Sequence, residues 1–356
     1  MQHATPQKPL RRKKFRRISS ILLFISMVFG LTAVPLAFSV PILTATKTDV
    51  LLVDNDTDNV ADPGDTIRYT VNLLNSGTMD ATNVDFTDTI DANTTLVAGS
   101  VKTTPIARHD SYAATGNVGI SVPAGSGVLV NDNDPDGTTP TLTIVSSPST
   151  SANGGNVAVA SDGSFTYNPP AGFEGTDTFS YTVQDSDGNQ DPATVSISVS
   201  DVIWFIDNSA GGGGDGRLSS PFNNIASFNA IQTGTAPNAK SGDGIFLYTG
   251  SGNYTSGITL LNNQFLIGQG ATSSIESIIG ITLPAHSNAL PTTGGTRPVI
   301  TNAGGSGITL ASGNLLRGLN VGNTSTSSGA GINGSSVGTL TILNMSITGQ
   351  GKAVDI

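Results

Sequence analysis

The chain contains no cysteine, little charge and few aromatic residues. Without cysteine it can form neither structural disulfides nor Cys-based zinc sites, so stability must come from β-packing, repetition or bound ions. Charged residues make up 12% of the sequence, about half of the usual share in a cytosolic globular protein. The aromatic share of 6% favours thin sandwiches or a solenoid over one large globule.

Long Leu/Glu/Lys/Ala stretches are also missing, whereas glycine is abundant, with 43 residues. Val, Ile and Thr alternate with polar residues, a period that is typical of half-buried strands. The sequence therefore predicts an all-β fold: two immunoglobulin-like β-sandwiches, followed by a right-handed parallel β-helix that is incomplete at its C-terminal end.

Charge is unevenly distributed along the chain. Residues 1–39 hold seven Lys/Arg and no Asp/Glu, which leaves 9 basic and 26 acidic residues in the remainder, a net charge of −17. This acidity argues against nucleic acid as a partner, because nucleic-acid binding needs a basic footprint. It agrees with solubility outside the cell and with attraction of cations.

The amino terminus has the layout of an export signal. A basic segment from Lys8 to Arg17 precedes the apolar run 18–38, and small residues, Ala37 and Ser39, stand where a signal peptidase cuts. We expect residues 1–39 to be a signal peptide and the remainder to be secreted or on the cell surface. The alternative is an uncleaved transmembrane helix at residues 18–38, long enough to span a bilayer, which would be the chain's one contact with the membrane.

The first expected domain spans residues 44–105. Ile67, Tyr69, Val71 and Leu73 share one face of a predicted strand. The segments "TKTD", "ADPGDTIRYTVNLLNSGTMDATNVDFTDTI" and "TTLVAGSV" resemble a family of surface-protein repeats, the eleventh family in the catalogue of domains of unknown function. The resemblance implies an immunoglobulin-like sandwich in a surface protein, without known catalysis.

The second expected domain spans residues 106–200. Its apolar residues alternate with polar ones in five short runs between turn signals such as Asp162-Gly163, which is the spacing of a sandwich. The segments "GVLVNDNDPDG", "SDGSFTYNPPAGFEGTDTFSYTVQDSDG" and "ATVSISVS" resemble the cadherin-like tandem repeats of bacterial adhesins. The sequence departs from these repeats at His109, where the resemblance implies an acidic residue and a calcium ligand.

The third expected domain spans residues 202–356. A strand, a glycine-rich loop and a helix beginning near Pro221 precede short aliphatic strands separated by Gly/Asn/Ser turns. This pattern resembles a pectin-lyase-like parallel β-helix with a capping helix and four or five coils. Another sandwich is the alternative. Because the sequence stops at "KAVDI" without a terminal cap, we expect a longer protein.

Catalysis on polysaccharides requires paired carboxylates, or carboxylates that hold a metal. Between Ile245 and Ile356 the only acidic residues are Glu276 and Asp355. We therefore expect no catalytic residues and no enzyme activity in this chain. The alternative is a secreted carbohydrate-active enzyme, of the polysaccharide lyase or hydrolase type, whose catalytic coils lie beyond Ile356.

Calcium is the expected cofactor, bound weakly. In "DNDTDNVADPGD" the spacing of the oxygen ligands matches a calcium loop, with Asn59 at the sharp turn where glycine is usual. The expected ligands are Asp54, Asp56, Asp58, Asp62 and Asp65, together with the backbone carbonyl of Val60. The alternative is a polar turn cluster that binds no ion.

A second candidate site begins in the same way, with Asp132, Asp134 and Asp136, but has Thr143 at the position of the last ligand. It would need ligands from elsewhere, either Asp110 or the pair Asp185 and Asp187.

Together these observations predict a structural or adhesive surface protein. Its partner would be a surface ligand, either a glycan or another cell-surface protein.

Overall fold

The computed structural model describes residues 41–356 except 78, 80, 82–83, 85–86, 91 and 138–141. The chain divides into two compact units, one ending at Thr95 and the other running from Leu96 to Ile356. The expected signal peptide, residues 1–39, lies outside the described residues. Within the described part, no helix is long and apolar enough to cross a membrane.

The first unit contains a long antiparallel hairpin of β1 (Leu43–Val53) and β2 (Thr66–Asn75). The strand predicted around Ile67–Leu73 is confirmed, since all four apolar residues lie in β2. Tyr69 and Leu73, however, remain about half exposed, at 47% and 49%. No described residue of this unit joins a buried hydrophobic cluster. The immunoglobulin-like sandwich expected over 44–105 therefore stays a prediction.

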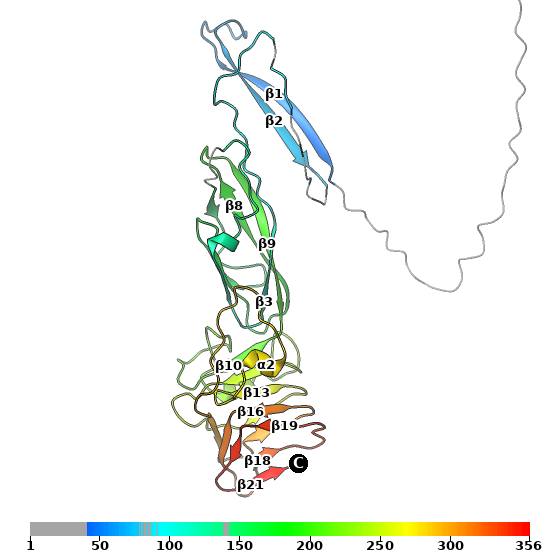
Figure 1. The fold of residues 1–356 in the computed structure, drawn as a ribbon, viewed down its shortest axis with the longest axis vertical. Helices are drawn as coiled ribbons and strands as arrows, with labels where there is room; N and C mark the ends of the chain where they lie inside the picture. The colour runs from blue at the N-terminus through cyan, green and yellow to red at the C-terminus, as the bar shows by residue number, and fades with distance from the viewer. Residues whose placement is uncertain are drawn as a thin grey trace, which may run out of the picture. The chain divides into compact units, whose positions relative to one another are not determined.

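The second unit begins with a two-sheet sandwich (Figure 1). One sheet has the order β3-β9-β8-β5 and the other the order β4-β7-β6. Strands β3 and β9 pair in parallel, and the other pairs are antiparallel. The elements are β3 (Asp110–Thr115), β4 (Ile120–Val122), the 3-10 turn η1 (Ala124–Ser126), β5 (Thr143–Ser146), β6 (Asn156–Val159), β7 (Phe165–Asn168), β8 (Gly175–Gln184) and β9 (Gln190–Ser200).

The core of the sandwich forms because alternate residues of each strand point inward. Phe179, Tyr181 and Val183 of β8 are buried, while the residues between them are at least partly exposed. Phe165 lies between Tyr112 and Phe179 with edge-on ring contacts at 4.8 and 5.6 Å. The predicted alternation thus produces a packed aromatic core, which stabilises the sandwich beyond simple area burial.

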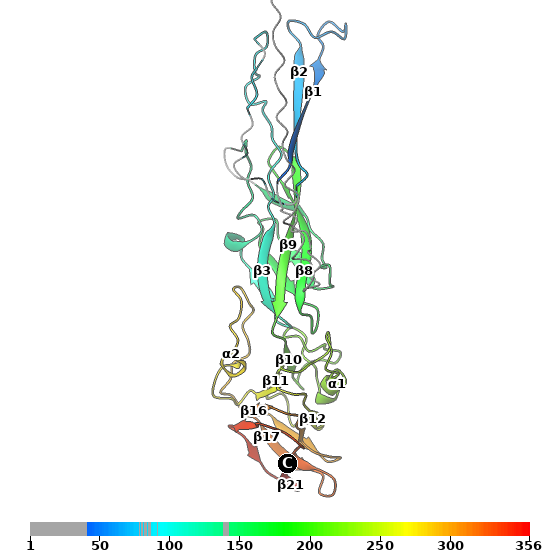
Figure 2. The ribbon, with the colours of Figure 1, turned by 90° about the vertical axis from the view of Figure 1, so that its right-hand side faces the viewer.

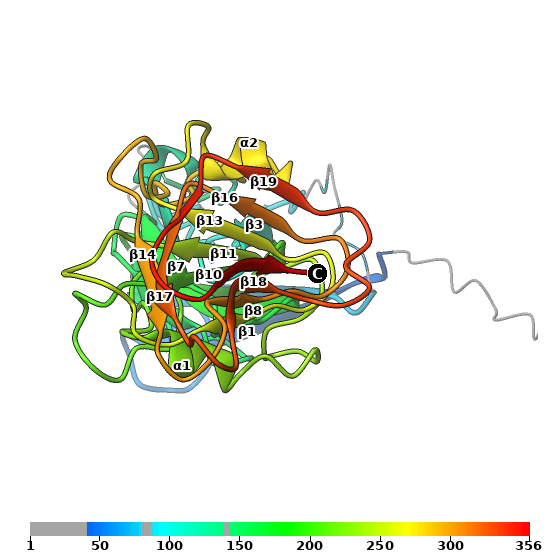
Figure 3. The same ribbon diagram turned by 90° about the horizontal axis from the view of Figure 1, so that it is seen from below.

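The rest of the unit consists of three parallel sheets, which we call the parallel-strand module (residues 203–355). Their orders are β10-β11-β13-β16-β19, β12-β15-β18-β21 and β14-β17-β20. Figure 3 shows β13, β16 and β19 on one side of the module and β14 and β17 on another. The strands are β10 (Ile203–Ile206), β11 (Gly244–Leu247), β12 (Ile258–Thr259), β13 (Phe265–Gly268), β14 (Val299–Asn302), β15 (Ile308–Thr309), β16 (Leu315–Arg317), β17 (Asn320–Thr324), β18 (Ala330–Asn333), β19 (Thr341–Leu343), β20 (Ser346–Ile347) and β21 (Lys352–Asp355).

Equivalent residues of successive parallel strands stack on one another. Trp204, Ile245, Leu266 and Leu316 are in register and all fully buried in one cluster. The opposite face of the same sheet carries a second cluster, which α2 (Ile275–Ile279) covers. Figure 2 shows α1 (Ile225–Asn229) and α2 on opposite sides of the strands. Both faces of this sheet are therefore apolar, as parallel sheets usually are.

The predicted helix near Pro221 begins later than expected. Asn224 is the N-cap of α1, and its side chain accepts a hydrogen bond from the Ser227 N–H at 2.7 Å. Phe222, next to Pro221, instead bridges β10 at Ile206. The helix begins where a side chain can satisfy its free N–H groups. The sequence pattern did not predict α2.

Candidate metal centres

The first candidate calcium loop brings three of its six expected ligands together. Carboxylate oxygens of Asp54, Asp56 and Asp58 lie within 4.8 Å of one another. Backbone N–H groups of Thr57 and Asn59 donate to the two oxygens of Asp54 at 2.7 and 2.9 Å. The hydrogen bond from Asn59 is the main reason why the pKa of Asp54 is lowered.

The turn at Asn59 has the geometry that the sequence predicts, because its φ of +63° is left-handed. Thr57 is also left-handed, at +65°, which is unusual for a β-branched residue. The remaining expected ligands have other contacts. The Val60 N–H donates to Asp58 at 2.7 Å, and Asp65 accepts from the backbone N–H groups of Asn55 and Asp62.

The second candidate site combines two of its expected ligands with one from a distant loop. Carboxylate oxygens of Asp134, Asp136 and Asp185 lie within 4.8 Å of one another. Asp185 was one of the partners that the sequence left open. It follows β8, whereas Asp134 and Asp136 lie between β4 and β5, so the fold of the sandwich makes the site.

Two further segments hold this site in place. The backbone N–H and hydroxyl of Thr103 donate to the two oxygens of Asp136 at 2.8 and 3.1 Å. Asn189 donates its backbone N–H and its amide to Asp185 at 2.8 and 3.0 Å, and its amide also donates to the Thr103 carbonyl. The site therefore connects the segment that precedes β3 with both acidic loops.

One oxygen of the second site lacks a partner among the described residues. Asp134 is buried, at 9% exposure, and its Oδ1 accepts no hydrogen bond. Burial raises the pKa of Asp134, and the neighbouring Asp136 raises it further. Burial also tends to raise the pKa of Asp136, but hydrogen bonds from Thr103 outweigh this effect, so that its pKa is lowered. A buried acceptor beside two carboxylates fits a hard cation such as Ca²⁺, which prefers oxygen ligands.

Asp132 does not join this site. Its carboxylate accepts from the Arg108 N–H at 2.7 Å and lies 3.1 Å from the Tyr181 hydroxyl, which also lies 3.1 Å from Asp110. Burial is the main cause that raises the pKa of Asp110 to about 6, with the charge of Asp132 adding to it. The expectation that Asp132 ligates together with Asp134 and Asp136 is thus not met by the geometry.

Asp187, another of the three residues left open as partners, forms an ion pair with Lys102 at 2.7 Å. Sequence reasoning missed the contributions of Lys102, Thr103 and Asn189. Lys102 is the only lysine between Lys47 and Lys240, which marks it as unusual but does not identify Asp187 as its partner. Thr103 and Asn189 carry no signal, because their roles depend on pairing across the sandwich.

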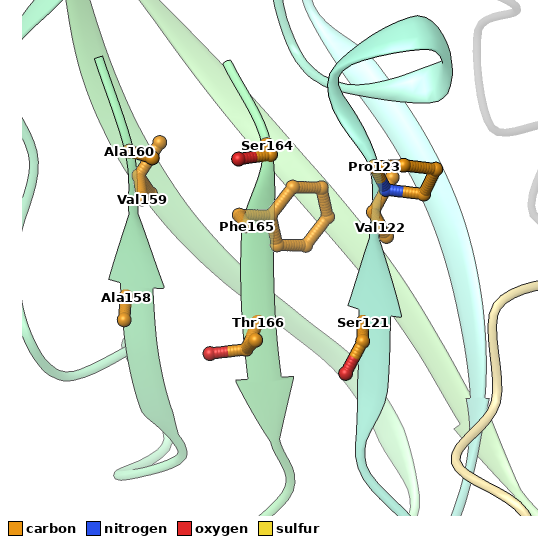
Figure 4. A pocket seen from close by; sticks show the side chains of 9 residues that line it. All are labelled: Ser121, Val122, Pro123, Ala158, Val159, Ala160, Ser164, Phe165 and Thr166. Carbon is orange, nitrogen blue, oxygen red and sulfur yellow. The ribbon is translucent and has the colours of Figure 1, made fainter. Parts of the chain in front are cut away.

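The two carboxylates that the sequence singled out in the parallel-strand module lie on different elements. Glu276 is in the first turn of α2, and Asp355 of β21 pairs with Lys352 at 3.1 Å. A hollow of about 460 Å³ lies on the β4-β7-β6 sheet (Figure 4). Its lining contains no titratable side chain: Ser121, Val122, Pro123, Ala158, Val159, Ala160, Ser164, Phe165 and Thr166. This hollow offers no group for acid–base chemistry.

Comparisons with known proteins bear on the sandwich. Residues 102–201 match the family model of the bacterial cadherin-like domain, which indicates a surface or adhesion-type module. No curated protein matches the chain. Among solved structures, an endo-fucoidan hydrolase of glycoside hydrolase family 107 is similar at 18% identity, covering 45% of this chain and 24% of the hydrolase. The TM-score of that match is 0.20, too low to carry an argument about fold or function.

Proposed function

We propose that the chain is an exported, non-catalytic cell-surface protein, with a structural or adhesive role and calcium-stabilised β-domains. The match of residues 102–201 to the bacterial cadherin-like domain carries this proposal. The strong net acidity of the chain after residue 39 supports it, because an acidic surface attracts cations and keeps a protein soluble outside the cell.

The parallel-strand module is best interpreted as a right-handed parallel β-helix. Each strand of the longest sheet pairs in parallel with the strand of the next turn of the chain, from β10 through β11, β13 and β16 to β19. The two other parallel sheets, with four and three strands, would supply the remaining sides of the later coils. Such a solenoid would serve the surface protein as a shaft or as a surface that displays binding residues.

Calcium binding is proposed at both acidic clusters. At the second cluster the Oδ1 of Asp134, which has no hydrogen-bond donor among the described residues, supports it, because a buried carboxylate oxygen without a donor is costly unless a cation satisfies it. At the first cluster the support is the close approach of Asp54, Asp56 and Asp58 and the left-handed turn at Asn59. Extracellular modules bind calcium with dissociation constants of about 0.1 to 1 mM.

The alternative of a secreted carbohydrate-active enzyme has no specific observation in its favour. It is tested by incubating the purified chain with pectin, alginate and fucoidan and measuring reducing and unsaturated ends. We expect no release above that of a heat-inactivated sample. Release that survives purification to homogeneity would establish the enzyme instead.

The surface role is tested by protease treatment of intact cells that express the full protein. We expect protease to remove the chain from intact cells, and millimolar calcium to slow its digestion relative to chelator. The mature amino terminus, read by mass spectrometry, should begin after Ser39. A chain that is digested only after cell lysis would contradict the proposal.

A further inference from the structure

The sandwich and the parallel-strand module meet at an extensive junction inside the second unit. Only Asp201 and Val202 separate β9 from β10, and residues 96–356 form a single compact unit. A connection of two residues leaves the sandwich directly beside the first strand of the parallel stack. Without a capping structure, the end of a stack of parallel strands would expose apolar side chains and unpaired backbone groups to solvent.

Backbone hydrogen bonds extend from the sandwich to the first turn of the module. The Ile203 N–H donates to the Gly116 carbonyl at 3.2 Å, and the Leu218 N–H donates to the Asn117 carbonyl at 2.9 Å. Asn117 is fully buried, and its side-chain oxygen accepts from the Gly172 N–H at 2.8 Å. One turn of the sandwich, residues 116–119, thereby satisfies polar groups that the end of the stack would otherwise leave unpaired.

Apolar side chains of the sandwich complete both hydrophobic clusters of the parallel-strand module. Val118 is fully buried in the cluster that contains Ile203 and Phe205. Ala171 packs against the cluster that contains Trp204. Beside these contacts, Lys240 of the module forms an ion pair with Glu174, the residue immediately before β8. The junction therefore has a buried apolar centre with polar groups around it.

A loop of the parallel-strand module also extends a sheet of the sandwich. The Ser121 N–H donates to the His286 carbonyl at 2.9 Å, and the Asn288 N–H donates to the Gly119 carbonyl at 2.8 Å. Ile120 of β4 and Ser287 form an antiparallel bridge. The Ser121 hydroxyl also donates a hydrogen bond to the Asn288 side chain. Residues more than 160 positions later in the chain therefore cover the edge of β4.

We propose that the end of the sandwich formed by residues 116–121 and 169–174 is the amino-terminal cap of the parallel-strand module, and that the two modules unfold as one cooperative unit. Contacts run in both directions across the junction: residues 116–119 cover the stack, and residues 286–288 cover β4. Such a joint transmits tension from one module to the other without a flexible linker. The proposal does not depend on calcium.

Gly172 offers a substitution that acts at this junction. Its φ is +66°, and a Cβ there would lie 1.7 Å from the Pro237 carbonyl oxygen and 2.9 Å from the Trp204 ring. Gly172→Ala should force the two modules apart. Gly154→Ala is the matched control, because Gly154 has a φ of +91° in the same sandwich but open space around its Cβ position. Both variants carry the strain of a left-handed alanine, and only one carries the clash.

The readout is hydrogen exchange of the full chain, followed by mass spectrometry of peptides from β8 and β9 and from β11 and β13. In the parent we expect peptides of both groups to exchange through the same slow opening reaction. Their loss of protection with increasing denaturant should coincide with the fluorescence change of Trp204, the single tryptophan. Gly172→Ala should lower the midpoint of the Trp204 thermal transition by roughly 5 °C more than Gly154→Ala does. Its loss of protection should be seen in both modules.

A milder variant covers the case in which Gly172→Ala does not fold. Asn288→Ala removes only the side chain that accepts from Ser121, and it should speed exchange in β4 and β7 although it lies in the other module. Two separate transitions in the parent would overturn the proposal. An Asn288→Ala effect confined to the parallel-strand module would overturn it as well.

Discussion

The chain contains two Asp-x-Asp-x-Asp runs, and the structure treats them differently. Asp54, Asp56 and Asp58 stay together in an exposed hairpin loop. In the second run, Asp132 turns to Tyr181, while Asp134 and Asp136 meet Asp185 across the sandwich. The spacing of the aspartates therefore predicts which carboxylates converge only in the isolated loop, and there only for three of the six expected ligands. Where the loop packs against a folded domain, buried donors and acceptors decide which carboxylates converge.

The largest expected effect is the loss of calcium stabilisation at the second cluster. At calcium a hundredfold above the dissociation constant, linkage stabilises the folded state by about 2.7 kcal/mol, which corresponds to roughly 5–10 °C in melting temperature. Asp185→Asn removes one carboxylate from the cluster and should abolish most of this shift, measured by calorimetry in calcium and in chelator.

Asp162→Asn is the control for that experiment. Asp162 lies in an exposed turn, where its carboxylate accepts from Ser164 and belongs to neither cluster. This variant should keep the parent's calcium response. If Asp185→Asn responds as strongly as Asp162→Asn, the second cluster is not the stabilising site.

A smaller effect should distinguish Asp110, which shares the Tyr181 hydroxyl with Asp132, from the carboxylates of the two clusters. The pKa of Asp110 is raised to about 6, above the unfolded value of about 3.9. Between these pH values the Asp110 carboxyl is therefore protonated in the native state but ionised in the unfolded state. Its contribution to the free energy of unfolding is present at pH 4 and is lost as the pH rises through 6. In the presence of chelator at pH 7, the free energy of unfolding of Asp110→Asn should be higher than that of the parent by on the order of 1 kcal/mol, after allowance for solvent screening.

The pH dependence distinguishes this explanation from a general effect of removing charge. The advantage of Asp110→Asn should disappear below about pH 4, when the parent is protonated as well, as measured by urea unfolding at both pH values. Asp162→Asn should show the opposite sign at pH 7, because hydrogen bonds from Ser164 lower the pKa of Asp162. An Asp110→Asn advantage that is the same at pH 4 and pH 7 would contradict the assignment.

Much of the sandwich could be predicted from local pattern, but the second site could not. The alternation of Phe179, Tyr181 and Val183 depends on neighbouring residues alone, and it placed β8 correctly. The same is true of Asn59, whose left-handed turn follows from its position in the loop. The departure of Asp132 depends on a hydroxyl 49 residues away and on the Arg108 N–H 24 residues before it, and no local pattern contains that information.

The parallel-strand module shows the same limit. Short aliphatic runs indicated strands, but their pairing requires residues from different turns of the chain, such as Ile258 with Ile308. The helix α2 is only five residues long, so periodicity cannot reveal it. Its Ser274 N-cap is a signal that could have been used, since the hydroxyl accepts from the Ser277 N–H.

The smallest expected effect is local to the first loop. Calcium at three times its dissociation constant should suppress opening of residues 54–65 about fourfold, measured as slower amide exchange of that segment in the full chain. The Asp54→Ala, Asp58→Ala double variant should lose this protection, while β8 and β9 remain unchanged. Protection that persists in the double variant would assign the loop to the class of polar turns that bind no ion.

We propose that Asp134, Asp136 and Asp185 bind a calcium ion in the sandwich that matches the bacterial cadherin-like domain. Equilibrium dialysis against radioactive calcium measures it most directly, because the number of bound ions is counted without reference to stability. The full chain with Asp134→Asn should bind one equivalent fewer than the parent, and Asp162→Asn should bind as many as the parent. Equal binding by the parent and Asp134→Asn would contradict the account.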